Sequence, residues 1–260
     1  MNRDEFLEGL LAADRHDGGL RCRRLFRVDA QLFASLRHEV ADLRDRCKPS
    51  VVGERSHVTN WAGPRGEVLQ YSLLNASGRT DDFASDHDLS TRNKWFFDAV
   101  RWPALSDWIT TWPDVINFRV HVLAAGAALE AHEEHVPFRT KRGGVGARLR
   151  FHLPIETNPE AELNLDGAVH HLEAGAVFLV NQGCVHSTHN RGAAPRVHLV
   201  WDSFLTSATF AFLFEASDPR LEPATPEVDV LRHEPLATHR RLMPAVARDE
   251  AAAMDVCESQ

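Results

Sequence analysis

The chain has 260 residues, a length that suits one large domain or one domain with a tail. Hydrophobic residues make up 43% of it and charged residues 25%, which is ordinary globular usage and argues against global disorder. The formal net charge of -8 argues against nucleic-acid binding, because that function needs a basic stripe on the surface.

The first part of the chain shows mainly helical patterns. Its opening segment, MNRDEFLEGL, is charged and mixed, so we expect neither a signal peptide nor a membrane span. Asp29 stands where an N-cap residue would accept hydrogen bonds from the first turn of a helix. The spacing of apolar residues predicts helices at 4–14, 29–46 and 93–111, the last ended by Pro113, and a strand at 68–74.

After Pro113 the pattern changes to short alternating runs separated by glycines. Many short strands at close spacing predict a sandwich or barrel, here of jelly-roll type. The predicted strands lie at 115–123, 147–154, 167–172, 176–181 and 195–203, and a last helix is predicted at 205–215.

These elements predict one mainly β domain over residues 1–216. Its β core spans about 115–203, and residues 1–112 give helical support. Residues 217–260 are interpreted as a C-terminal extension with a short helix at 244–254, because prolines and charges break the periodicity there. The four cysteines lack C-x-x-C spacing, so we expect reduced thiols in a cytoplasmic protein.

Histidines concentrate in the β core. Nine of the 15 histidines fall between His121 and His198, about twice as many as an even distribution would place there. Such enrichment is typical of a metal site or of acid–base chemistry. Surface histidines on a polar barrel rim are the alternative.

Three predicted strands separate arginine and histidine from packing residues on opposite faces. Lysine and glutamate, which a solvated face would share, are absent from the polar sides. Because arginine holds a carboxylate at two points, we interpret these faces as a barrel mouth that binds a small anion. Exposed strand faces of chance composition are the alternative. The polar sides comprise Asn117, Arg119 and His121; Arg148, Arg150 and His152; and Arg196, His198 and Asp202.

A candidate metal site combines His132 and Glu134 with the distant His186. Iron oxygenases bind Fe(II) through two histidines and one carboxylate, which leaves three positions for a 2-oxo acid and dioxygen. The His-x-Glu pattern alone is weak, because it also occurs at His171-Leu172-Glu173. The first copy is favoured because Arg196 lies ten residues beyond His186, whereas the second copy has no arginine placed in this way.

Three segments resemble the aspartyl/asparaginyl β-hydroxylase family, which includes bacterial cis-proline hydroxylases. The third reproduces the family's pattern of a histidine, an asparagine four residues on, an arginine ten residues on and a closing aspartate. The resemblance covers about 115–203, with a weaker echo at Gln70–Asn75. The three segments are Leu129–Glu134, Arg150–Ile155 with Thr157–Pro159, and His186–Asp202 with its Asn190 and Arg196.

The resemblance implies a double-stranded β-helix, a jelly-roll or cupin-like barrel with flanking N-terminal helices, that uses Fe(II), 2-oxoglutarate and O2. It implies that His132 and His186 are iron ligands. It also implies that the distal carboxylate of 2-oxoglutarate binds Arg196, with Arg150 and His152 as further contacts.

The third iron ligand is expected to be Glu134. Family members with a carboxylate ligand usually have aspartate at this position, and members that hydroxylate aspartyl residues in protein domains lack the ligand. Glu133 or water is therefore an alternative, as is a solvated acidic loop that contains Glu130, Glu133 and Glu134.

We therefore expect an Fe(II)- and 2-oxoglutarate-dependent dioxygenase. It would hydroxylate a C–H bond of an amino acid or of an amino-acid-derived, carrier-bound or short-peptide substrate, with release of succinate and CO2. Nucleic-acid and membrane partners are not expected, and a homodimer is left open. Candidate substrate contacts are Arg119, Asn117 and Tyr71, and also Arg55 and Trp61.

Two other classes of protein use similar barrels. One is a cupin-like, metal-dependent isomerase or other redox-neutral enzyme, which would need no anion-binding arginine near His186. The other is a non-catalytic barrel that binds a small anion.

Overall fold

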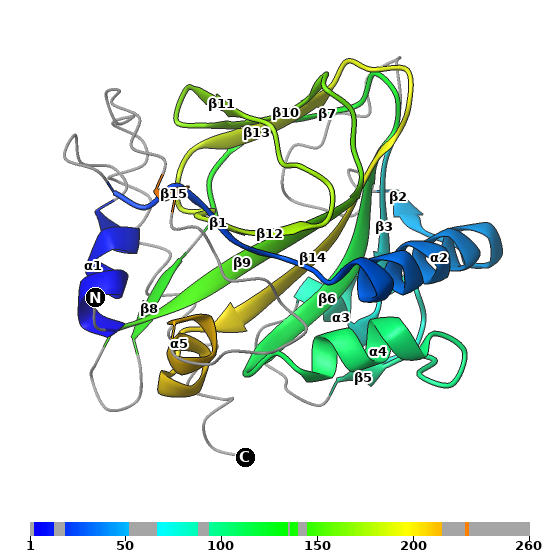
Figure 1. Ribbon diagram of the computed structural model, residues 1–260, viewed down its shortest axis with the longest axis horizontal. Helices are drawn as coiled ribbons and strands as arrows, with labels where there is room; N and C mark the ends of the chain where they lie inside the picture. The colour runs from blue at the N-terminus through cyan, green and yellow to red at the C-terminus, as the bar shows by residue number, and fades with distance from the viewer. Residues whose placement is uncertain are drawn as a thin grey trace.

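The computed structural model describes residues 3–12, 19–51, 67–87, 94–134, 136–139, 145–214 and 227–228. Two antiparallel sheets face each other (Figure 1). The larger sheet has the strand order β15-β1-β12-β9-β14-β6-β3-β2, with β8 paired to β9. Its strands are β15 (Glu227–Val228), β1 (Cys22–Arg27), β12 (Ala176–Val180), β9 (Val145–Glu156), β14 (Arg196–Phe204), β6 (Val115–Leu123), β3 (Val68–Ser72), β2 (Ser50–Val51) and β8 (Pro137–Arg139).

The smaller sheet closes the barrel with the strand order β11-β10-β13-β7. From β6 to β14 the chain crosses repeatedly between the two sheets, which is how a double-stranded β-helix is wound. The predicted fold class is therefore confirmed. The strands of the smaller sheet are β11 (Ala168–His170), β10 (Ala161–Leu165), β13 (His186–Asn190) and β7 (Ala128–His132).

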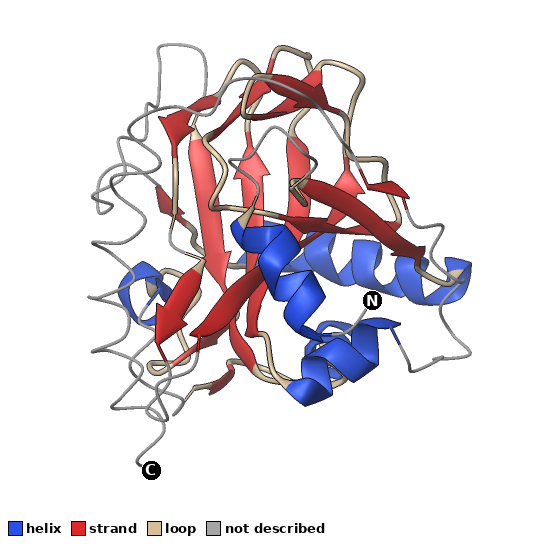
Figure 2. Ribbon diagram, turned by 90° about the vertical axis from the view of Figure 1, so that its left-hand side faces the viewer, coloured by secondary structure: helices blue, strands red, loops and turns tan. Residues whose placement is uncertain are grey.

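The helices lie away from the smaller sheet, which is at the top in both views (Figure 1, Figure 2). Asp29 caps α2 as predicted, because its carboxylate accepts hydrogen bonds from the backbone N–H groups of Gln31 and Leu32. The helices are α1 (Arg3–Leu11), α2 (Ala30–Arg46), α3 (Phe83–His87), α4 (Pro103–Thr110) and α5 (Ser207–Phe214).

The main hydrophobic core lies between the larger sheet and the helices. Leu36 and Val40 of α2 join Trp108 of α4 in one buried cluster with Phe151 of β9 and Trp201 of β14. Because strand residues alternate, the other face of the same strands points into the barrel. That inner face is polar and also buried, so the predicted separation of the two faces is confirmed and the solvated alternative is wrong.

One predicted helix is partly wrong. Residues 93–111 are not one helix: Trp95 and Phe96 form β5, which pairs with β4 (Leu74–Asn75), and helix α4 begins only at Pro103. Proline has no N–H to donate and clashes with the preceding turn, so it is unfavourable inside a helix but suits its first position. The predicted strand at 68–74 likewise ends at Ser72, as β3.

The predicted C-terminal extension lies almost entirely outside the described residues, including the proposed helix at 244–254. Its described part, β15, pairs with Arg23 and Arg24 of β1. No helix within the described segments is long and apolar enough to span a membrane.

Candidate metal centre and anion pocket

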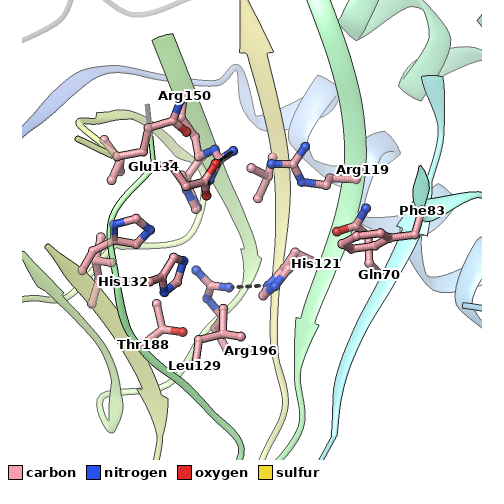
Figure 3. A pocket seen from close by; sticks show the side chains of 16 residues that line it. Gln70, Phe83, Arg119, His121, Leu129, His132, Glu134, Arg150, Thr188 and Arg196 are labelled. Carbon is pink, nitrogen blue, oxygen red and sulfur yellow. Dashed lines mark hydrogen bonds and ion pairs between the residues drawn. The ribbon is translucent and has the colours of Figure 1, made fainter. Parts of the chain in front are cut away.

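A cavity of about 100 Å³ lies between the two sheets. The larger sheet contributes arginine and histidine side chains, and the smaller sheet contributes two of the predicted metal ligands (Figure 3). The residues that line it are Gln70, Phe83, Arg119, His121, Leu129, His132, Glu134, Arg150, His152, Leu163, Val180, Gln182, His186, Thr188, Arg196 and Val200.

The structure brings the three predicted metal ligands together. His186 of β13 pairs directly with His132 of β7, and the two ring centroids are 4.3 Å apart. Ligand atoms of His132, His186 and Glu134 all lie within 4.8 Å of one another. Donor atoms that share one octahedral ion at the usual bond lengths lie about 3 Å apart, so small movements of these side chains would complete the set.

Both histidines present the correct nitrogen for a metal. The Nδ1 of His132 lies 2.7 Å from the carbonyl oxygen of Glu130, and the Nδ1 of His186 lies 2.9 Å from that of Cys184. A carbonyl oxygen can only accept, so each Nδ1 donates its hydrogen and each Nε2 has a free lone pair. Burial and the nearby His132 lower the pKa of His186 to about 4, which keeps its ring neutral at pH 7.

Two arginines hold the third ligand, Glu134. Arg150 forms a two-point ion pair with this carboxylate, and Arg148 lies 3.2 Å from it. Burial alone would raise the pKa of Glu134, but the two guanidinium groups hold this pKa well below its usual value. The carboxylate is therefore ionised, as a metal ligand must be.

Arg150 also connects Glu134 to a buried ionic network. Its guanidinium lies 2.8 Å and 2.9 Å from the two carboxylate oxygens of Asp202. Asn117 donates to the same carboxylate at 2.9 Å, and Arg119 lies 3.7 Å from it. Burial would raise the pKa of Asp202, but Arg150 and Arg119 hold it below its usual value. Arg150 is thus engaged by two carboxylates of the chain itself.

Arg196 differs from the other arginines of the cavity. It is buried, and within the described part of the chain its side chain forms a single hydrogen bond, 3.0 Å long, to the Nδ1 of His121. No acidic side chain among the described residues pairs with it. Burial lowers its pKa to about 9, so it remains charged at pH 7. A buried charge without a counter-ion is costly unless a ligand supplies the partner.

His152 lines the same cavity. Its Nδ1 is 3.3 Å from the Nδ1 of His198, and both rings are buried. Burial, together with the nearby Arg196, holds the pKa of both histidines well below the usual value. Both rings are therefore neutral at pH 7, and one Nδ1 donates to the other.

The predicted substrate contacts lie in different places. Arg119 lines the cavity, whereas Asn117 is buried beside Asp202 and does not reach it. Tyr71 packs in the hydrophobic core on the opposite face of β3, because alternation turns its neighbour Gln70 inward instead. Arg55 and Trp61 lie outside the described residues.

Several cavity residues were not predicted as site residues, among them the polar Gln70, Gln182 and Thr188. The hydroxyl of Thr188 is buried, and it forms no hydrogen bond within the described segments. Thr188 is two residues from His186 on the same face of β13, which is a signal that sequence reasoning could have used.

Another carboxylate, Asp86 of α3, is buried and lies 3.3 Å from Arg119, which lines the cavity. Burial raises its pKa from 3.8 to about 6, although Arg119 and Lys94 oppose the shift. The folded state therefore binds this proton more tightly than the unfolded state does. This contribution to stability is complete below about pH 4 and is lost as the pH rises through about 6.

We expect Asp86→Asn to remove this pH dependence. Between pH 4 and pH 6 the free energy of unfolding of the wild type should fall by on the order of 2–3 kcal/mol relative to that of the variant, since one pKa unit corresponds to about 1.4 kcal/mol. Denaturant unfolding of both proteins at several pH values measures the difference. A difference that stays constant over this range would contradict the shifted pKa of Asp86.

Fold and site together define a cupin-like barrel with two histidines and one carboxylate gathered beside a buried arginine. Residues 98–204 match the family model described as Aspartyl/Asparaginyl beta-hydroxylase. This segment includes β6 through β14, with all three candidate ligands and Arg196. The predicted family resemblance is therefore confirmed over these residues.

Several solved structures are similar in fold. A Pseudomonas putida prolyl-4-hydroxylase is 14% identical with a TM-score of 0.42, covering 76% of this chain and 98% of that one. The α-ketoglutarate-dependent epimerase SnoN from nogalamycin biosynthesis is 16% identical with a TM-score of 0.43, covering 87% and 98%. A predicted oxalate decarboxylase from Thermotoga maritima is 14% identical with a TM-score of 0.35, covering 61% and 94%. None of the curated protein sequences compared with the chain matches it.

Proposed function

We propose that the protein is an Fe(II)- and 2-oxoglutarate-dependent dioxygenase. It would hydroxylate a C–H bond of an amino acid or amino-acid-derived substrate and release succinate and CO2. The main support is that one cavity contains both a His132–Glu134–His186 ligand set and a buried arginine without a carboxylate partner among the described residues. A redox-neutral metal enzyme would need the first feature but not the second.

His132, His186 and Glu134 would hold the metal. Bound Fe(II) would supply the oxidising chemistry with O2 and 2-oxoglutarate. The chain itself fixes the geometry: the carbonyls of Glu130 and Cys184 orient the two imidazole rings so that each Nε2 faces the site.

Arg196 would bind the distal carboxylate of 2-oxoglutarate. A guanidinium and a carboxylate form two parallel hydrogen bonds, which fix orientation as well as add binding energy. His121 accepts a hydrogen bond from Arg196 and so restricts its position. The neutral His152 and the hydroxyl of Thr188 line the same cavity and are candidates for further contacts with the co-substrate.

Arg150 has a different proposed role from the one that the family resemblance implies. Because it already pairs with Asp202 and Glu134, we propose that it keeps the Glu134 carboxylate ionised and close to the two histidines. Asp202 would in turn hold the guanidinium of Arg150 in place.

An anaerobic titration tests the proposal directly. Fe(II) and 2-oxoglutarate should bind together with the metal-to-ligand charge-transfer absorption expected for a chelated 2-oxo acid. Admission of O2 in the presence of a panel of amino acids, their N-acetyl derivatives and short peptides should then release succinate. Binding of 2-oxoglutarate that needs no metal, or turnover of a substrate without O2, would contradict the assignment.

Glu134→Ala tests the carboxylate ligand. We expect weaker Fe(II) binding and a loss of most succinate formation, because only two protein ligands remain and Arg150 loses one of its partners. Glu130→Ala is a matched control, since its side chain is exposed nearby on β7 and only its backbone carbonyl contacts His132. Fe(II) affinity can be measured by competition with a chelator; unchanged affinity and turnover in Glu134→Ala would mean that the two histidines suffice.

A further inference from the structure

Three residues form the side of the cavity that lies across from His132 (Figure 3). They are Gln70 of β3, Phe83 of α3 and Arg119 of β6. None of them belongs to the metal ligand set or contacts Arg196 through a hydrogen bond. This side of the cavity is therefore available to a molecule other than the co-substrate.

The side-chain amide of Gln70 has a fixed orientation. Its Nε2 lies 3.1 Å from a carboxylate oxygen of Asp86 and 3.4 Å from the hydroxyl of Ser72. An ionised carboxylate can only accept, so the amide nitrogen must face Asp86 and the amide oxygen must face away from it. Asp86 thus fixes which end of the Gln70 amide faces the cavity.

The Oε1 of Gln70 accepts no hydrogen bond from the described residues, and this oxygen points into the cavity (Figure 3). A carbonyl oxygen that lines a cavity without a donor from the protein can accept a hydrogen bond from a ligand. The missing partner must be a hydrogen-bond donor, which a carboxylate, a keto group or an ether oxygen cannot provide.

Arg119 complements this acceptor with donors. Its guanidinium lies 3.3 Å from Asp86 and 3.7 Å from Asp202, so two carboxylates compensate its charge, and it still lines the cavity. An acceptor beside a donor matches a group that has an N–H next to a carbonyl or carboxylate oxygen. Phe83 adds an apolar surface for the carbon skeleton of such a group.

We propose that Gln70, with its orientation fixed by Asp86, determines substrate specificity by accepting a hydrogen bond from an N–H group of the substrate. The neighbouring oxygen of the substrate binds Arg119. This inference rests on the proposed oxygenase function. Gln70 would thus select substrates with an amine or amide N–H and reject isosteres whose corresponding atom has no hydrogen.

The test compares matched probes on the intact protein under anaerobic conditions. Binding of 2-oxoglutarate with Fe(II) is measured first by calorimetry, and a wild type that fails here refutes the proposed function itself. The loaded protein is then titrated with the common amino acids, with their N-acetyl derivatives and with the corresponding 2-methoxy acids. Comparison of the amino acids with their N-acetyl derivatives separates recognition of an amine from recognition of an amide. The 2-methoxy acids have no N–H hydrogen to donate at this position.

We expect the best N–H probe to bind the wild type at least about tenfold more tightly than its 2-methoxy counterpart, because the methoxy group has no hydrogen to donate to Gln70. Gln70→Met keeps the side-chain length but removes the acceptor, so this ratio should fall to about one while the affinity for 2-oxoglutarate is retained. Gln31→Met makes the same change at an exposed position of α2 and should leave the ratio unchanged.

Asp86→Asn provides the second variant. An asparagine can either donate or accept, so the amide of Gln70 is free to turn over, and the preference for N–H probes should decrease. An unchanged ratio in Gln70→Met would overturn the proposal. Failure of every N–H probe to bind a wild type that binds 2-oxoglutarate would overturn it as well.

Discussion

Alanine at His186 or at His132 is expected to abolish Fe(II)-dependent succinate formation. Each substitution removes one of the two imidazole Nε2 atoms that face the site, and no other histidine of the described segments joins this ligand group. The remaining ligands cannot hold an ion on one face, which the chelation of a 2-oxo acid requires. Loss of the ion removes the reaction itself and does not merely slow one step.

Metal content and turnover together measure this effect. The variants should show no Fe(II)-dependent absorption with 2-oxoglutarate and no succinate above background, whereas near-wild-type circular dichroism should show that the barrel is intact. His38→Ala on the exposed side of α2 is a control for the loss of a histidine as such. Full activity in either site variant would remove the oxygenase assignment, because no alternative ligand set among the described residues could replace it.

The β core was predictable because its strands follow a simple physical rule. Strands β6 and β14 pack one face into the main hydrophobic core and turn the other into the barrel, so apolar and polar residues alternate along 115–123 and 195–203. The structure has β6 at Val115–Leu123 and β14 at Arg196–Phe204, almost as predicted.

The strands of the smaller sheet that hold the metal ligands were not predictable in the same way. Strand β13 (HSTHN) contains no apolar residue, and none of the residues of β7 (ALEAH) is buried, because these strands form the site or remain partly exposed. Periodicity identifies a strand by its packing face, and these two strands have almost none. The functional motif therefore located them better than their hydrophobic pattern did.

Partnerships between charged residues could not be read from the sequence either. The sequence placed Arg150 and Arg196 on equivalent polar faces and suggested that both would hold the co-substrate. The register of β14 with β9 puts Asp202 opposite Arg150, so that guanidinium is neutralised within the chain, whereas Arg196 is not. Register is set by the whole sheet, and a shift of two residues would have placed Asp202 opposite Arg148 or His152 instead.

Arg196→Ala is expected to weaken the binding of 2-oxoglutarate roughly a hundredfold, since truncation of one partner of a buried, hydrogen-bonded charge pair costs about 3 kcal/mol. The affinity of Arg196→Lys for 2-oxoglutarate should lie between those of Arg196→Ala and the wild type, because an ammonium group keeps the charge but cannot form the two-point contact. Arg191→Ala removes an exposed arginine that pairs with Glu162 and is a control for charge. An unchanged dissociation constant in Arg196→Ala would mean that another residue holds the distal carboxylate.

The shape of the ligand gives a sharper test of the same residue. 2-Oxopentanoate has the same metal-chelating end as 2-oxoglutarate but lacks the distal carboxylate, so it should bind Arg196→Ala no less tightly than it binds the wild type. Burial lowers the pKa of Arg196 to about 9, so the charged guanidinium destabilises the ligand-free fold at pH 7. The ligand-free variant should therefore be at least as stable as the wild type. Only the wild type should gain markedly in melting temperature when 2-oxoglutarate is added, because a ligand stabilises a fold in proportion to its affinity.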